Sequence, residues 1–191
     1  MKRITVYCGS NDGNDPVYKA QAFLLGKTLA QRNIELVYGG AHVGLMGAIA
    51  DGALGEGGKV TGVLPGFLRN KEIAHEKLTE LLLVETMSQR KIKIEELADG
   101  IIALPGGYGT LDELFEALTN AQLQLHRKPV GLLNTEGFYD GLVQLLDTMT
   151  SRGLLKEVNR NMLLVSEDID ELLDKMSRYI APSVSKWIGK N

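Results

Sequence analysis

The chain has 191 residues, of which 44% are hydrophobic and 24% are charged, and its formal net charge at pH 7 is -3. This length most simply gives one domain, residues 1–191, which can bury a hydrophobic core without disulfides or metal ions. No apolar run is long enough to cross a membrane, and the acidic balance argues against a broad surface for nucleic acid or acidic membranes. We therefore expect a globular protein of the cytoplasm that binds neither nucleic acid nor membrane and in which any anion site is local.

The cysteine and histidine content predicts neither a disulfide framework nor a metal centre. Cys8 is the single cysteine, and His42, His75 and His126 are isolated from one another along the chain. None of them follows the spacing of a known metal-binding motif. The short apolar stretch that follows the first two basic residues is typical of a first strand and not of an export signal.

Short apolar runs alternate with helical patterns along almost the whole chain. The predicted strands cover residues 3–8, 34–39, 59–65, 78–85, 100–105, 129–134 and 162–166. The predicted helices cover residues 16–33, 44–57, 86–99, 110–125, 137–151 and 168–179, and Asp15 is placed to cap the first of them. This alternation predicts an α/β, Rossmann-like fold: a doubly wound, mostly parallel sheet of about seven strands with helices on both faces.

Four glycine-containing loops follow predicted strands, and their sequences are CGSNDGND, YGGAHVGLMG, LPGF and LPGGYGT. In a doubly wound sheet such loops gather at the carboxyl edge, where ligands bind. A glycine loop in front of a helix lets a phosphate approach free backbone N–H groups without any basic side chain. For a single loop, a tight turn with close helix–strand packing explains the glycines equally well. Two such loops at equivalent strand ends favour a phosphate ligand.

Two other nucleotide-binding motifs are excluded by their context. The first loop, GSNDGN, does not match the dinucleotide fingerprint, so NAD is not expected. The triplet Gly26-Lys27-Thr28 ends like a Walker A motif, but Gln21 occupies the position of the first glycine of that motif. The triplet also lies inside a helical pattern, and we interpret it as part of a surface helix.

The segment ALPGGYGTLDELFE, residues 103–116, contains the strongest candidate for an active site. Thr110 and Glu113 have the spacing of a helix capping box, which would give Glu113 a purely structural role. Glu113 also lies off the predicted apolar stripe of this helix, where it can face a ligand. Successive helix positions point about 100° apart, so Asp112 and Glu113 cannot both face one small target. Only one of the two carboxylates is expected to take part in chemistry.

In the preceding helix Arg90, Ile94 and Leu97 have the i, i+4, i+7 spacing of a buried stripe. A guanidinium at the end of such a stripe can reach solvent, or it can pair with a carboxylate such as Glu95 or Glu96. An arginine and a carboxylate beside phosphate-binding turns would also suit cleavage of a phosphorylated sugar. In that chemistry the arginine holds an anion, and the carboxylate stabilises an oxocarbenium-like centre or activates water. The pattern alone leaves both interpretations open.

Residues 105–113, PGGYGTLDE, resemble the PGGxGTxxE motif of the Lonely Guy (LOG) family, and Arg90-Lys91 resembles its second motif. The likeness extends over CGS at 8–10, VYGGAHVGLMG at 37–47, ELADGIIALPGG at 96–107 and HRKPVGLLNTEGFYD at 126–140. Members of the LOG family are phosphoribohydrolases that release a free base and ribose 5-phosphate from nucleoside 5'-monophosphates. Their substrates are typically cytokinin riboside monophosphates, and many members were once labelled lysine decarboxylases. The resemblance implies a nucleoside monophosphate as the small-molecule partner, and a homodimer with the site near its interface.

The resemblance implies that Arg90 and Glu113 are the catalytic pair. It further implies that the nucleotide is bound by Gly9, Ser10, Gly39, Gly40, Gly44, Met46, Glu72, Lys91, Gly106, Gly107, Tyr108, Gly109, Thr110, Leu111, Asp112 and Thr119. Ser88 and Asn120 depart from the family pattern, in which many members have His and Trp. No pyridoxal phosphate lysine motif is recognisable, so neither a cofactor nor a metal is expected. The alternative is a module that binds a nucleotide without cleaving it.

Overall fold

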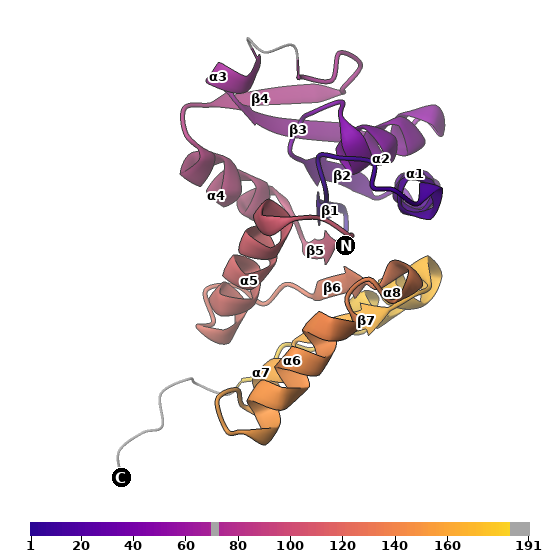
Figure 1. Cartoon of the computed structure of the whole chain (residues 1–191). Helices are drawn as coiled ribbons and strands as arrows, with labels where there is room; N and C mark the ends of the chain where they lie inside the picture. The colour runs from indigo at the N-terminus through magenta and orange to yellow at the C-terminus, as the bar shows by residue number, and fades with distance from the viewer. Residues whose placement is uncertain (70–72, 184–191) are drawn as a thin grey trace.

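The computed structural model describes residues 1–69 and 73–183 of the chain. Seven strands form one sheet in the order β4-β3-β2-β1-β5-β6-β7, and all six pairings between neighbours are parallel (Figure 1). The strands are β1 (Arg3–Tyr7), β2 (Glu35–Tyr38), β3 (Val60–Pro65), β4 (Glu80–Val84), β5 (Gly100–Ala103), β6 (Val130–Leu133) and β7 (Leu163–Ser166). The predicted Rossmann-like sheet is therefore confirmed.

Helices connect consecutive strands and cover both faces of the sheet. One face carries α1 (Pro16–Gln31), α2 (Gly44–Gly55) and α8 (Ile169–Ser177), and the other carries α4 (Met87–Leu97), α5 (Tyr108–Gln122) and α6 (Asp140–Ser151). The short helices α3 (Gly66–Arg69) and α7 (Glu157–Arg160) and the 3-10 turn η1 (Thr135–Gly137) extend three connections. None of the helices in the described ranges has the length and apolar character that crossing a bilayer requires.

Two helix starts differ from the sequence prediction by two residues or more. The helix predicted from residue 137 begins at Asp140, because Glu136 and Gly137 adopt positive φ angles of 50° and 67° that interrupt a right-handed helix. Helix α5 begins at Tyr108, two residues before the predicted start at Thr110. This second difference changes the role of the candidate catalytic residue, as the site geometry shows.

The hydrophobic core consists of two layers, one on each face of the sheet. The layer beneath α1, α2 and α8 includes Ile4, Leu25 and Ile49, all of which are fully buried. The layer beneath α4, α5 and α6 includes Ile101 and Leu114, which are also fully buried. Because the central strands are covered on both faces, their sequences are almost continuously apolar, which is typical of parallel sheets.

Strands are added first on one side of β1 and then on the other, so the sheet has a topological switch point between β1 and β5. Strands β2 to β4 are added on one side of β1, and β5 to β7 are added on the other. The chain leaving β1 enters α1 on one face, whereas the chain leaving β5 enters α5 on the opposite face. The two loops therefore diverge and leave a crevice at the carboxyl ends of β1 and β5, the place where doubly wound sheets bind ligands.

Helices α1 and α2 pack closely because glycines remove the side chains where the two helices meet. A Cβ atom on Gly26 would lie 2.1 Å from the carbonyl oxygen of Ile49, and one on Gly52 would lie 2.1 Å from the carbonyl oxygen of Phe23. Gly26 lies inside a helix as predicted, but it is buried against α2 and is not a surface residue. Helix packing therefore explains the glycine of the Walker-like triplet.

Gly26→Ala is expected to lower the free energy of unfolding by about 3 kcal/mol, because the added methyl group overlaps the backbone of α2. Denaturant unfolding measures this change. Gly55→Ala is the matched control, since a Cβ at Gly55 meets no atom within 4 Å; it should change stability by no more than about 1 kcal/mol, in the stabilising direction. Equal stability of the two variants would contradict the packing role of Gly26.

Candidate active site

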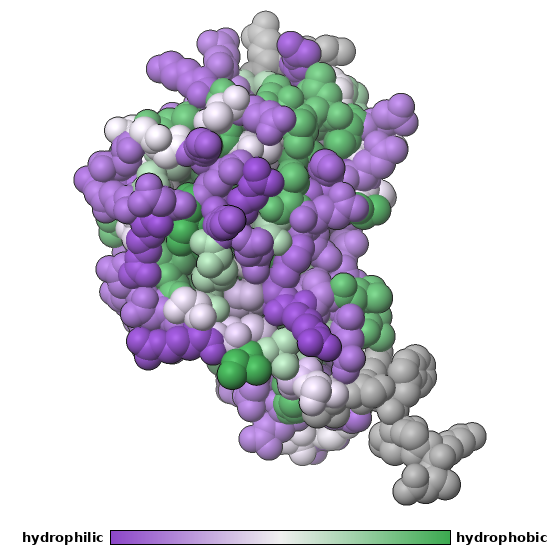
Figure 2. Space-filling view, turned by 180° about the vertical axis from the view of Figure 1, so that it is seen from behind, coloured by the Kyte–Doolittle hydropathy of each residue, from purple (hydrophilic) through white to green (hydrophobic). Residues whose placement is uncertain are grey.

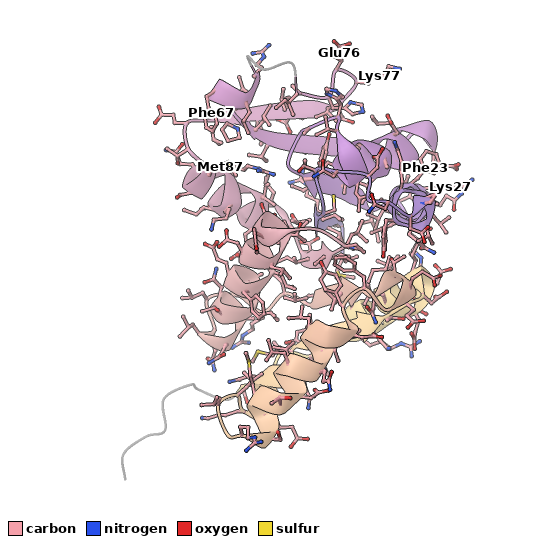
Figure 3. All side chains as sticks on the ribbon, in the orientation of Figure 1. Phe23, Lys27, Phe67, Glu76, Lys77 and Met87 are labelled. Atoms are coloured by element: carbon pink, nitrogen blue, oxygen red, sulfur yellow. The ribbon has the colours of Figure 1, made fainter. Side chains whose placement is uncertain are left out.

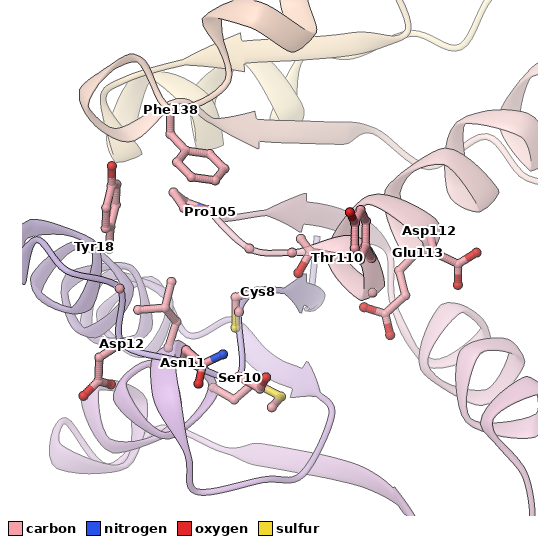
Figure 4. Close-up of a pocket in the computed structure, with 18 of the residues that line it drawn as sticks. Cys8, Ser10, Asn11, Asp12, Tyr18, Pro105, Thr110, Asp112, Glu113 and Phe138 are labelled. Carbon is pink, nitrogen blue, oxygen red and sulfur yellow. The ribbon is translucent and has the colours of Figure 1, made fainter.

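A cavity of about 630 Å³ lies at the crevice between β1 and β5. The loop after β1, the loop after β5 and the first turns of α4 and α5 form most of its wall (Figure 4). Twelve of the predicted site residues line it: Gly9, Ser10, Met46, Arg90, Lys91, Gly106, Gly107, Tyr108, Gly109, Thr110, Asp112 and Glu113. The fold thus brings together segments that are up to about a hundred residues apart in the chain.

The start of α5 shows that the predicted capping box is wrong. Gly107 is the N-cap residue and no side chain caps this end of the helix, so Thr110 lies within the first turn and is buried. Glu113 lies in the second turn, too far along the helix to reach back to the N-cap backbone. The structural role that the spacing offered to Glu113 is therefore absent.

The three glycines at the start of α5 have two different functions. A Cβ on Gly106 would lie 2.1 Å from Thr110 Oγ1 and 2.9 Å from the backbone nitrogen of Gly9, so this position has no room for a side chain. The Gly9 N–H donates to the Pro105 carbonyl oxygen at 3.0 Å, which holds the two loops together. A Cβ on Gly107 or Gly109 would meet nothing within 4 Å, and both residues are exposed. These two glycines leave the uncapped N–H groups of α5 open to a ligand.

Arg90 and Glu113 form a buried ion pair across the cavity wall. Arg90 Nη2 lies 3.9 Å from Glu113 Oε1, and the two side chains are 13% and 10% exposed. Arg90 therefore faces Glu113 and not the carboxylates of Glu95 or Glu96. Its Nε is buried and has no hydrogen-bond partner among the described residues. The guanidinium thus retains donor capacity that a bound anion could use.

The glycine at residue 39 makes room for this arginine. A Cβ on Gly39 would lie 2.0 Å from Arg90 Nη2 and 3.1 Å from Met46 Sδ. The guanidinium therefore occupies the space that a side chain at residue 39 would fill. Gly39 supports the site from behind and does not line the cavity itself.

Burial controls the protonation of the groups in the cavity. Desolvation raises the pKa of Glu113 from 4.5 to about 7, although the nearby Arg90 charge lowers it. Burial likewise raises the pKa of the Cys8 thiol, so this cysteine stays neutral and is not a nucleophile at neutral pH. A carboxyl group that titrates near neutrality is suited to take part in proton transfer.

Lys91 is held on the surface of α5 by two carboxylates. Its Nζ lies 3.0 Å from Asp112 Oδ2 and also pairs with Glu116, and the hydrogen bonds that it donates to Glu116 and Asp112 raise its pKa. The Asp112 side chain is 63% exposed, whereas that of Glu113 is 10% exposed. The two carboxylates therefore point in different directions, as helix geometry predicts.

Some predicted site residues lie outside the cavity. Gly40 and Gly44 have positive φ angles of 77° and 58°, and a Cβ on Gly44 would lie 2.3 Å from the Ser10 backbone. The Leu45 N–H at the start of α2 already donates to the Gly9 carbonyl oxygen. The second glycine loop therefore serves chain packing in this structure, in contrast to the open glycines before α5.

Leu111 and Thr119 also lie away from the cavity. Both line a shallow depression on the outer surface of α5, together with Tyr108 and Asp112, which line the cavity as well. Glu72, the remaining predicted binding residue, lies outside the described residues.

The cavity also has residues that were not among the predicted site residues: Cys8, Asn11, Asp12, Gly13, Tyr18, Leu45, Met87, Ser88, Pro105 and Phe138. Tyr18 and Phe138 form an edge-to-face pair with ring centroids 5.7 Å apart. In Figure 4 this pair lies at one end of the cavity, while Asp112 and Glu113 lie at the other. Tyr18 and Phe138 come from α1 and from the connection after β6. In the sequence, the one indication that they belong to the site was that both residues follow the carboxyl end of a predicted strand.

The described residues contain no group of three or more His, Cys, Asp or Glu side chains that could hold a metal ion. The arrangement consists of an uncapped helix N-terminus, a buried arginine–carboxylate pair and a crevice at the switch point of a parallel sheet. It defines a Rossmann-like protein with a site for a small anionic ligand, such as a nucleotide.

Comparison with known proteins identifies the family. The profile of the family described as "possible lysine decarboxylase" matches residues 46–176. The chain is 42% identical to the cytokinin riboside 5'-monophosphate phosphoribohydrolase LOG2 of Arabidopsis thaliana, over 100% of this chain and 91% of that protein. It is 44% identical to the cytokinin riboside 5'-monophosphate phosphoribohydrolase LOG of Oryza sativa subsp. japonica, over 94% of this chain and 74% of that protein. The chain belongs to this family, which includes the LOG phosphoribohydrolases.

Solved structures share the fold at lower identity. The molybdenum cofactor binding protein of Rippkaea orientalis matches with a TM-score of 0.69 and 24% identity, over 93% of this chain and 96% of that chain. The molybdenum cofactor carrier protein of Chlamydomonas reinhardtii matches with a TM-score of 0.70 and 22% identity, over 93% of this chain and 97% of that chain. These similarities support the fold alone.

The raised pKa of Glu113 predicts a pH-dependent stability cost. Between pH 4.5 and about 7 the folded state binds more protons than the unfolded state, so stability falls as pH rises through this range. Glu113→Gln removes this cost, and its stability relative to the parent should increase by on the order of 3 kcal/mol between pH 4 and pH 8. Denaturant unfolding at both pH values measures it, with the exposed Glu167→Gln as the control for lost charge. If the difference in stability between Glu113→Gln and the parent is the same at both pH values, the raised pKa of Glu113 is contradicted.

Proposed function

We propose that this protein hydrolyses the N-glycosidic bond of purine riboside 5'-monophosphates, such as isopentenyladenosine monophosphate or AMP. The products are the free base and ribose 5-phosphate. The observation that carries the proposal is the buried Arg90–Glu113 pair beside the uncapped N-terminus of α5. The names of the relatives in the same family agree with this chemistry.

The phosphate is assigned to the N-terminus of α5. The exposed Gly107 and Gly109 leave the first N–H groups of the helix open, and the helix dipole favours an anion there. Among the described residues, no other helix at the cavity offers this combination, because the start of α2 is bonded to Gly9 and the starts of α1 and α4 are capped by Asp15 and Thr86. The protein thus binds an anion despite its net negative charge.

Glu113 acts on the ribose. In hydrolysis the bond between C1' and the base nitrogen breaks, the oxygen of water bonds to C1', and one proton of that water ends on the departing base. The Glu113 carboxylate stabilises the oxocarbenium-like centre and orients the water. Arg90 holds the carboxylate and contributes its unpaired Nε–H to the bound nucleotide.

Direct assay of the products tests the proposal. The protein is incubated with AMP and with isopentenyladenosine monophosphate, and free base and ribose 5-phosphate are quantified. Glu113→Gln should lower kcat by at least about 100-fold while the circular dichroism spectrum is retained. Asp112→Asn on the next residue should change KM more than kcat, because Asp112 is largely exposed and pairs with Lys91. Nucleotide binding without product, measured by calorimetry, would support a non-catalytic binding module in place of the hydrolase.

We further propose a homodimer that uses the outer surface of α4 and α5. Tyr108 and Phe115 line the depression on α5 and are 94% and 36% exposed, and Ile92 on α4 is 56% exposed. Figure 2 shows a separate group of hydrophobic side chains toward the top of the molecule, and this group is not part of the proposed interface. Because Tyr108 also lines the cavity, a partner on this surface would lie next to the site. The exposed apolar area supports an interface there.

Ile92→Asp combined with Phe115→Asp should convert the dimer to a monomer, because two charges would be buried at the contact. Light scattering after size-exclusion chromatography measures the mass. Phe23→Asp is the control, since Phe23 is 45% exposed on α1 and lies on the opposite side of the molecule from Met87 in Figure 3. Dissociation by the Phe23 variant alone would place the interface on α1 instead.

A further inference from the structure

A second cavity lies behind Glu113, on the side away from the nucleotide cavity. It has a volume of about 230 Å³ and lies between α4 and α5, over the end of β1. We call it the rear chamber, and its polar wall comes from Tyr7, Lys91, Glu95, Glu113, Glu116 and Asn120. Its volume suffices for several water molecules, each of which occupies about 30 Å³ in the liquid.

Glu113 and Lys91 line both cavities, so they form the partition between them. Within the described residues no protein group donates a hydrogen bond to the Glu113 carboxylate, and its closest cationic atom is Arg90 Nη2 at 3.9 Å. A carboxylate that is 90% buried needs hydrogen-bond donors to remain ionised. The rear chamber is the side from which such donors can reach it while a nucleotide occupies the front cavity.

Tyr7 supplies a donor to this chamber. The residue is only 4% exposed, and it lines the chamber. Burial and the carboxylates of Glu113, Glu95 and Glu116 raise its pKa, and Glu113 has the largest effect of the three. The hydroxyl therefore keeps its proton at neutral pH and remains a donor in the chamber that these carboxylates line.

Asn120 organises the opposite wall of the chamber. Its Nδ2 donates to both carboxylate oxygens of Glu95, at 3.3 and 3.1 Å. The Lys128 Nζ donates to the backbone carbonyl oxygen of Glu95. Because Glu95 already accepts these hydrogen bonds, Glu113 is the carboxylate that lacks a protein donor and that the Tyr7 hydroxyl can serve.

We propose that Tyr7 is a positioning residue for Glu113, acting through water in the rear chamber that both side chains line. The hydroxyl stabilises the ionised carboxylate and fixes its orientation toward the ribose. This role rests on the proposed function only for its effect on turnover. The groups that face Glu113 are Arg90, Lys91 and Glu95 from α4, Asp112 and Glu116 from α5, and Tyr7 and Cys8 from the end of β1.

Tyr7→Phe tests the proposal, because it removes the hydroxyl and keeps the buried ring. Loss of the donor should raise the pKa of Glu113 by about one unit, measured by carbon-13 NMR of the carboxyl groups and assigned with Glu113→Gln. The acid limb of the kcat profile should move to higher pH by the same amount, and kcat at pH 7 should fall by about fivefold with KM unchanged. Tyr38→Phe is the matched control, since the Tyr38 hydroxyl is buried and unpartnered but lines neither cavity.

An unchanged Glu113 pKa in Tyr7→Phe overturns the proposal, as does an equal shift in Tyr38→Phe. Failure of the parent protein to cleave any nucleoside monophosphate would overturn the proposed function, while the NMR titration would still decide the role of Tyr7. If Tyr7→Phe does not fold, Asn120→Leu provides the second test from the α5 side. It removes the amide that holds Glu95, so Glu95 can compete with Glu113 for the Tyr7 hydroxyl and the Glu113 pKa should rise; an unchanged value again contradicts the proposal.

Discussion

The buried pair of Arg90 and Glu113 is the interaction on which the site depends. Burial alone would keep Glu113 protonated, and the guanidinium opposes this by favouring the charged form, so the carboxyl group titrates near neutrality. The pair requires a glycine at residue 39, because the guanidinium occupies the space of that side chain. Glu113 also forms part of the wall between the front cavity and the rear chamber, so its side chain borders both.

The backbone at the switch point determines where the ligand can bind. Gly106 lets the loop after β5 touch Gly9 of the loop after β1, and these contacts position the start of α5. Gly107 and Gly109 then leave the first turn of that helix uncovered. Of these three neighbouring glycines, Gly106 therefore serves close packing, while Gly107 and Gly109 leave the helix start accessible.

Similarity of fold does not by itself identify the ligand that a protein binds. Two solved structures with TM-scores of 0.69 and 0.70 are described as molybdenum cofactor binding or carrier proteins. The relatives that are 42% and 44% identical over most of the chain are phosphoribohydrolases by name. A shared doubly wound sheet supports either ligand, so function follows from the side chains at the crevice. In this chain these are the arginine–carboxylate pair and the aromatic end formed by Tyr18 and Phe138.

The sequence by itself determined the seven strands, their parallel arrangement and the edge of the sheet at which the site lies. It did so because alternation of apolar runs with helices, and glycines before helix starts, are local signals. The true start of α5, the partner of Arg90, the packing role of Gly26 and the aromatic end of the cavity were decided only by the tertiary structure. Each depends on residues distant in sequence that meet across a helix crossing or a sheet edge. Spacing along the chain suggested a cap for Glu113, whereas the fold placed it in a buried wall between two cavities.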